Sequence, residues 1–269
     1  MSTYISLSYL DLGAASFFLI LNAVFSILLK LGLERRLLVS SLRMIVQLLM
    51  VGLVLKTVFA VSSPWLTAFL AFCMIAFAGR EIRARQERQL KGLWGYSLGT
   101  ASMMLAGMTV TVFALTTQIN PDPWWSPRYA LPLFGMILGN TMTGISLGLD
   151  TLHTTLYRER LAIEAQLMLG ETRWSAVRPV TRRALRSGFT PIINSMAATG
   201  IVSLPGMMTG QILSGVDPQE AVKYQLLIMF LIGGATGLGV IGAVFGSIWR
   251  LTDHRHRLRL DRLKTGPSP

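Results

Sequence analysis

Long apolar blocks alternate with short polar segments along the whole chain. A membrane-spanning α-helix needs about 20 consecutive apolar residues, and most of the blocks reach that length. We expect helices over Leu10–Leu29, Leu37–Ala60, Ser63–Gly79, Leu93–Thr116, Leu131–Leu152, Thr190–Leu213 and Ala221–Trp249. The sixth is expected to break at Ser203-Leu-Pro205, because a proline removes a helix hydrogen bond. The third block has the shortest apolar core, which leaves open whether it crosses fully. The pattern predicts an all-α polytopic membrane protein with about seven transmembrane helices.

The Lys and Arg residues indicate how these spans are oriented. All but four of the 25 fall within residues 30–36, 80–91, 158–186 or the part of the chain from Arg250 onward. With the seven predicted spans, these segments share one side of the membrane. Cytoplasmic loops carry an excess of Lys and Arg. We therefore expect an external N-terminus and a cytoplasmic C-terminus.

The composition supports a bilayer as the main partner and argues against nucleic acid. Hydrophobic residues make up 52% of the chain and charged residues only 14%, against about 25% charged in ordinary soluble domains. The net charge of +12 is spread between the apolar blocks rather than gathered in one basic domain. The single cysteine, Cys73, rules out an intramolecular disulfide, and we interpret it as a small buried hydrophobe.

One predicted cytoplasmic segment, over residues 157–187, is too polar to span. It begins as a helix, reaches Gly170, whose missing Cβ permits a sharp turn, and continues as a basic helix into the sixth span. The alternative is a solvated basic loop on anionic lipid. We thus expect spans one to five over residues 1–156, this segment over 157–187, spans six and seven over 188–250, and a basic tail over 251–269. The tail is expected to continue as a short amphipathic or surface helix and to fray at Gly266–Pro269.

The residues Glu164-Ala-Gln-Leu-Met-Leu-Gly170 resemble the E-A-A-x-x-x-G loop of ABC-transporter permeases, with Gln166 in place of the second alanine. The resemblance implies that Glu164, Ala165 and Gly170 belong to a coupling helix that docks on a cytoplasmic ATPase subunit. No phosphate-binding G-x-x-x-x-G-K-[ST] motif occurs in the sequence. We therefore expect this chain to bind no cofactor and ATP to be hydrolysed on a separate partner chain.

Two longer stretches, residues 135–146 and 194–211, resemble signatures of the FetB family. That family comprises permease subunits of a bacterial ABC exporter associated with iron, and is similar to plant half-transporters linked to aluminium tolerance. The resemblance implies a permease homodimer in the bacterial inner (plasma) membrane that exports a metal, with iron as the expected cargo. The alternatives are a non-metal cargo, an ATPase-independent channel or a secondary carrier. A membrane enzyme is disfavoured, because no nucleophile, base and orienting group come together in the sequence.

Polar residues inside the predicted spans form stripes at helical spacing, which places them on single faces. The second span has Ser40, Arg43 and Gln47, and the fifth has Asn140, Thr143, Ser146 and Asp150. Polar groups in a membrane mark a substrate route or bond neighbouring helices together, and both interpretations stay open. The candidate route residues are Arg43, Gln47, Asn140, Thr143, Ser146, Asn194, Pro205, Met207, Met208 and Gln211.

No metal site follows from the sequence. The three histidines have no known ligand spacing. Met207 and Met208 are soft donors suited to Cu(I) rather than Fe(II), and core packing is the favoured interpretation for both. Asp150 and His153 share a helix face, which permits an ion pair but favours a structural role. The glycines of the seventh span, among them Gly233/Gly237 and Gly242/Gly246, have small-xxx-small spacing that allows close helix packing, within the chain or between two copies.

Overall fold

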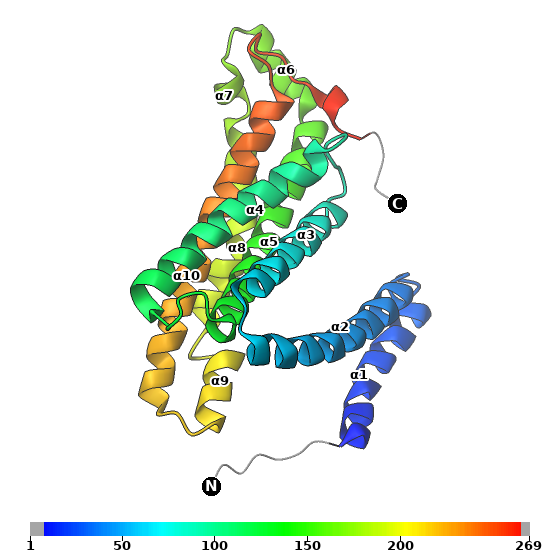
Figure 1. Cartoon of the computed structure of the whole chain (residues 1–269). Coiled ribbons are helices and arrows are strands. Elements are labelled where there is room, and N and C mark those ends of the chain that lie inside the picture. Colours follow the sequence, from blue (N-terminus) through cyan, green and yellow to red (C-terminus); the bar gives the residue numbers. More distant parts are fainter. Residues whose placement is uncertain (1–7, 265–269) are drawn as a thin grey trace. The chain divides into compact units, whose positions relative to one another are not determined.

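The computed structural model describes residues 8–264, which form helices joined by turns (Figure 1). Its contacts divide the chain into two compact units. The first unit runs up to Ser62 and also contains Leu213–Gly215, and the second unit contains the rest of the described chain.

The first unit holds α1 (Tyr9–Leu28) and α2 (Glu34–Val61), which pack against each other. Ser8 and Asp11 form a capping box, in which each side chain accepts the other residue's backbone N–H and so starts α1. In the turn between the helices, the Ser26 hydroxyl accepts the Leu33 N–H at 2.9 Å and donates to Glu34 at 2.8 Å. Both helices lie where the apolar pattern predicts them.

The second unit is built around one central helix, α5. Its elements are α3 (Pro64–Ala84), α4 (Trp94–Phe113), the π-helical turn η1 (Ala114–Ile119), α5 (Pro127–Arg158), α6 (Arg160–Met168), α7 (Arg173–Ala176), α8 (Arg178–Ala198), α9 (Gly206–Leu213, its last residue belonging to the first unit), α10 (Pro218–Leu251) and the 3-10 turn η2 (Leu260–Arg262). α5 packs against α3, α4, α8 and α10, and Figure 1 shows these helices bundled together.

Small residues let these helices touch backbone to backbone. A Cβ added to Gly144 on α5 would lie 2.8 Å from the carbonyl oxygen of Gly188 on α8. The glycines of α10 serve the same purpose: Cβ atoms on Gly233 and Gly237 would meet side chains of α8, and one on Gly246 would meet a side chain of α4. The small-residue spacing of the last span is therefore used for packing within the chain, so it carries no argument for a dimer.

Six helices of the part of the chain that the structure describes are long and apolar enough to cross a membrane. They are α1, α2, α3, α4 with η1, α5 and α10. The protein is thus a polytopic all-α membrane protein. α3 extends to Ala84, five residues beyond the predicted end, and so reaches spanning length. The seven-span count and the N-out, C-in orientation stay predictions.

The sixth predicted span, Thr190–Leu213, is interrupted at the predicted break, and the interruption is longer than expected, from Thr199 to Pro205. α8 ends at Ala198, Gly200 adopts a positive φ of 88°, and α9 begins only at Gly206. Pro205 cannot donate a backbone hydrogen bond, which prevents the helix from continuing through this turn. The predicted basic helix and the first part of the predicted sixth span form one continuous helix, α8. The proline break separates α8 from α9.

The basic tail is not the surface helix that the sequence predicts. The Asp253 carboxylate accepts the backbone N–H groups of Arg255 and Arg257 at 3.0 and 2.9 Å, which closes a tight turn. The chain then folds back, and Leu263 is buried and pairs with Leu90 in a single antiparallel bridge. These contacts are more favourable than a surface helix because they bury Leu263. The predicted fraying at residues 266–269 lies outside the described residues.

Candidate functional site

α6 is held to the protein along one face and exposed along the other. Ile163 is 3% exposed, and Leu167 packs with it against the main apolar core of the second unit. Leu161 and Met168, on the opposite side, are 72% and 84% exposed. Glu164 and Ala165 are exposed as well. The helix therefore presents an apolar stripe that no other part of residues 8–264 covers, as expected of an interaction surface.

Gly170 makes the turn that the sequence predicts. Its φ is 92°, a left-handed conformation that favours glycine. The Gly170 N–H donates to the Leu167 carbonyl and the Glu171 N–H to the Gln166 carbonyl, both at 3.1 Å. These bonds close the end of α6 in the manner of a glycine C-cap. The turn is consequently fixed in shape.

The far side of this turn is connected to the C-terminal tail. Thr172 caps the four-residue α7, its hydroxyl accepting the Ser175 N–H at 3.3 Å. The Arg173 N–H donates to Nδ1 of His256 at 3.0 Å. Arg183 of α8 reaches back to Glu159, at the start of α6, at 2.6 Å. The segment from α5 to α8 is thus braced at both ends, although the exposed ion pair adds little free energy.

Asp150 and His153 hold the loop of residues 85–91 and do not pair with each other. The Asp150 carboxylate accepts the Glu87 N–H at 2.7 Å. His153 is fully buried, with Nδ1 2.9 Å from the Arg88 carbonyl oxygen and Nε2 2.7 Å from the Ser247 hydroxyl. A carbonyl only accepts, so Nδ1 carries the proton and Nε2 accepts from Ser247. Their structural role, favoured from the sequence, is the one found.

The polar stripe of α5 divides into exposed and buried members. Asn140 is exposed and Thr143 is half-buried, whereas Ser146 is buried and donates to the Met142 carbonyl at 2.7 Å. The Thr143 hydroxyl accepts the Arg85 guanidinium at 3.5 Å. The sequence did not predict this contact, because Arg85 follows another helix. Only the first two residues face the open side of α5.

Asn194 of α8 lies close to this open face. α5 and α8 run antiparallel, with Gly144 opposite Gly188 and Gly148 opposite Ala184. Asn140 therefore lies near the level of residue 192, about 3 Å along the axis from Asn194. Both asparagines are exposed on the side of the α5–α8 pair away from α10. The structure therefore places these two predicted residues at neighbouring levels of adjacent helices.

The residues around the helix break have different surroundings. Pro205 is half-buried at the break itself, as is Met208 on α9. Met207 packs against an apolar cluster that is separate from the main apolar core of the second unit, which supports the packing interpretation for this residue. The side-chain oxygen of Gln211 is buried and accepts no hydrogen bond from the described residues. Arg43 and Gln47 belong to the first unit, where both are exposed on one face of α2.

No group of three or more His, Cys, Asp or Glu residues within residues 8–264 lies close enough together to hold a metal ion. His153 is engaged in the core and His256 in the tail contact with α7. The amide and hydroxyl groups of the α5–α8 face are neutral hydrogen-bonding groups. The described residues therefore provide no evident set of ligands for a tightly bound metal ion.

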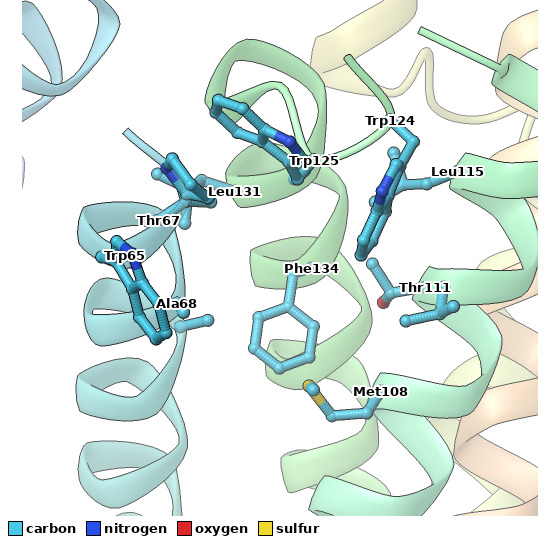
Figure 2. Close-up of a pocket in the computed structure, with 14 residues that line it drawn as sticks. Trp65, Thr67, Ala68, Met108, Thr111, Leu115, Trp124, Trp125, Leu131 and Phe134 are labelled. Atoms are coloured by element: carbon cyan, nitrogen blue, oxygen red, sulfur yellow. The ribbon is translucent and has the colours of Figure 1, made fainter. Parts of the chain in front are cut away.

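An apolar pocket of about 400 Å³ opens at the other end of α5, between α3, α4 and the turn before α5. Figure 2 shows the rings of Trp124 and Trp125 at its rim and Phe134 on its inner wall, with Ala68 directed into the space from α3. The apolar pattern did not predict that these residues line a cavity. Their enclosure of a cavity depends on the packing of helices that lie far apart in the sequence.

Comparison with known proteins shows the family. Residues 9–251 match the model of an uncharacterised protein family, UPF0014. A UPF0014 membrane protein of Synechocystis is 38% identical over 84% of this chain and 86% of its own length. The probable iron export permease protein FetB of Escherichia coli is 33% identical over 87% of this chain and 88% of its own. Protein ALUMINUM SENSITIVE 3 of Arabidopsis thaliana is 31% identical over 87% and 83%.

No solved structure is significantly similar to the chain. The sequence matches extend through all five helices of the central bundle and the α6–α7 turn. They agree with the resemblance drawn from the two signature stretches. The chain therefore belongs to the UPF0014 family of membrane proteins.

Proposed function

We propose that this chain is the permease subunit of an ABC transporter, working as a homodimer with separate ATPase subunits in the bacterial plasma membrane. The observation that carries the proposal is α6: a short helix, anchored by Ile163, that exposes Leu161 and Met168. An uncovered apolar stripe on α6, which lies between α5 and α8 in the chain, gives a partner protein a contact through which it can move both helices. ATP binding and hydrolysis in that partner would move α6 and so tilt α5 and α8.

The cargo we propose is a metal, with iron as the first candidate. This part rests on kinship with the Escherichia coli protein named as a probable iron export permease. The exposed α5–α8 face, with Asn140 and Asn194, is the proposed lining of the route. Its neutral oxygen and nitrogen groups suit a cargo that is bound weakly and released. The α2 residues Arg43 and Gln47 stay predicted members of that route.

The test of the docking helix is co-purification of the full chain with its cognate ATPase. Met168→Asp places a charge in the centre of the proposed contact, and we expect at least about a tenfold loss of association. Leu93→Asp is the matched control, because Leu93 is also 84% exposed but lies at the start of α4. Equal association of both variants would show that α6 is not the docking helix.

A transport assay distinguishes the proposal from an independent channel or carrier. We expect vesicles containing this chain alone to move no iron, and vesicles that also hold the ATPase to move it only with ATP. Iron movement by the chain alone would overturn the ABC assignment. ATP-driven movement of another solute, with iron inert, would retain the mechanism and refute the cargo.

A further inference from the structure

The pocket at the outer end of the second unit has walls from three helices and almost no polar groups. Trp65 and Ala68 come from α3, Met108 and Thr111 from α4, and Phe134 from α5 (Figure 2). No charged side chain lines it. A hydrated ion or charged cargo would lose its solvation here without compensation, so the pocket is no part of an ion route.

Its hydroxyl groups make no polar subsite. Thr67 donates to the Ser63 carbonyl at 2.9 Å and is satisfied within its own helix. The Thr111 oxygen is buried and has no hydrogen-bond partner within residues 8–264. A single isolated hydroxyl does not orient a polar ligand, which needs several convergent groups. The ligand that fits is therefore an apolar one.

The pocket also lies at the depth where a lipid tail begins. Tryptophans are enriched at the boundary between headgroups and hydrocarbon, and Trp65, Trp124 and Trp125 all lie at this end of the bundle. Thr111 is eight residues from the end of η1 at Ile119, which corresponds to about 12 Å of helix. The space thus extends from the interface into the hydrocarbon layer, as an acyl chain does.

A positive charge lies close to the outer end of this space. Arg128 precedes the pocket residue Leu131 by three positions on α5, so it lies on the same side one turn nearer the end of the helix. Arg128 is exposed and forms no ion pair with any described residue. A guanidinium at the interface is well suited to a phosphate.

We propose that this pocket is a lipid site that holds one acyl chain of a bilayer phospholipid, with the lipid phosphate near Arg128. The lipid fills the space between α3, α4 and α5, and its chain contacts Phe134. This site is separate from the α5–α8 polar face and from α6. It does not depend on which solute is carried.

The test uses the full chain in phosphatidylcholine vesicles that contain a phosphatidylcholine with a photoreactive diazirine in its acyl chain. After illumination, peptide mapping locates the labelled residues. We expect label on Ala68, Met108 and Phe134 to exceed label on Leu105, which is 65% exposed on α4 outside the pocket. Equal labelling of Leu105 and the pocket residues would mean contact with bulk lipid only and would overturn the proposal. So would a pocket that stays unlabelled, because another part of the protein would then cover it.

Matched variants make the test specific. Ala68→Phe fills the space, and we expect pocket labelling to fall about tenfold. Ala101→Phe adds the same ring at an exposed α4 position outside the pocket and should change nothing. Ala71→Leu, at another lining position, replaces the first variant if that one does not fold. Undiminished labelling in a folded pocket-filling variant contradicts the proposal.

Two further variants identify the ligand. Thr111→Val removes the hydroxyl but keeps the shape, so acyl-chain labelling should persist; its loss would indicate a hydrogen-bonding ligand instead. Arg128→Gln should lower labelling by the phospholipid about threefold or more through the lost phosphate contact. A fatty acid with the same diazirine distinguishes the sources: if it alone labels the pocket, the phospholipid assignment is wrong.

Discussion

The two ends of α5 are held in different ways. At one end, Asp150 and His153 make directional hydrogen bonds to the backbone of residues 87 and 88, and His153 also bonds Ser247 of α10. At the other end, Leu131 and Phe134 line an open pocket whose walls are almost entirely apolar. Hydrogen bonds weaken steeply with misalignment, whereas apolar contacts are non-directional.

This difference suggests how the helix could transmit movement. The hydrogen-bonded end continues into α6, so a displacement of α6 would carry α5, the loop of residues 85–91 and α10 together. The apolar end can slide against α3 and α4 without leaving buried polar groups unpaired. We therefore expect the bundle to move as a lever that is stiff near α6 and compliant near the pocket.

The largest expected effect comes from breaking the stiff end. His153→Ala removes a fully buried ring and leaves the Ser247 hydroxyl and the Arg88 carbonyl without their partner. We expect a loss of about 3 kcal/mol in the free energy of unfolding, from the cavity and the unpaired groups together. Reversible unfolding in detergent measures it. Thr111→Val at the compliant end should cost less than about 0.5 kcal/mol, because that hydroxyl has no partner to lose; similar losses in both variants would refute the comparison.

Two glycines on α5, one closely packed against α8 and one in open space, test the middle of this helix. Gly144→Ala would bring a Cβ 2.8 Å from the Gly188 carbonyl oxygen, so α8 must shift, at a cost of about 2 kcal/mol. Gly139→Ala meets nothing within 4 Å, and should be neutral or stabilise the helix by up to about 1 kcal/mol. Thermal unfolding of the two variants should therefore shift in opposite directions. A destabilised Gly139→Ala protein would show that this face is covered in the folded assembly.

The smallest effect concerns the tail that braces the stiff end. The backbone N–H of Arg257 lowers the pKa of Asp253 from its ordinary value of 3.8. A lowered pKa stabilises the turn above that ordinary value, and the contribution is lost as pH falls through the lowered one. We expect amide exchange of residues 255–258, corrected for its intrinsic rate, to accelerate below about pH 4. Asp253→Asn should show faster exchange already at pH 6 and no such pH dependence, with Glu171→Gln as an unaffected control.

Much of the fold could be predicted because the apolar blocks are local features of the sequence. Asp217 and Pro218 start α10 through the local capping pattern of a helix N-terminus, and Gly170 ends α6 as predicted. The break before α9 was predicted from Pro205, which lacks the backbone N–H that a helix needs, but its full extent from Thr199 to Pro205 was not. The tail helix was wrong because Leu263 is instead buried against Leu90 of a distant loop.

The sequence by itself determined that this is a membrane protein, roughly where most of its apolar helices lie, and that the chain turns at Gly170. Each of these follows from residues adjacent in the chain. Only the tertiary structure decided that Asn140 and Asn194 share a face, that the α10 glycines are used within the chain, and that three tryptophans enclose a pocket. These depend on which helix faces are buried against each other, and that choice is made by packing between residues far apart in the sequence.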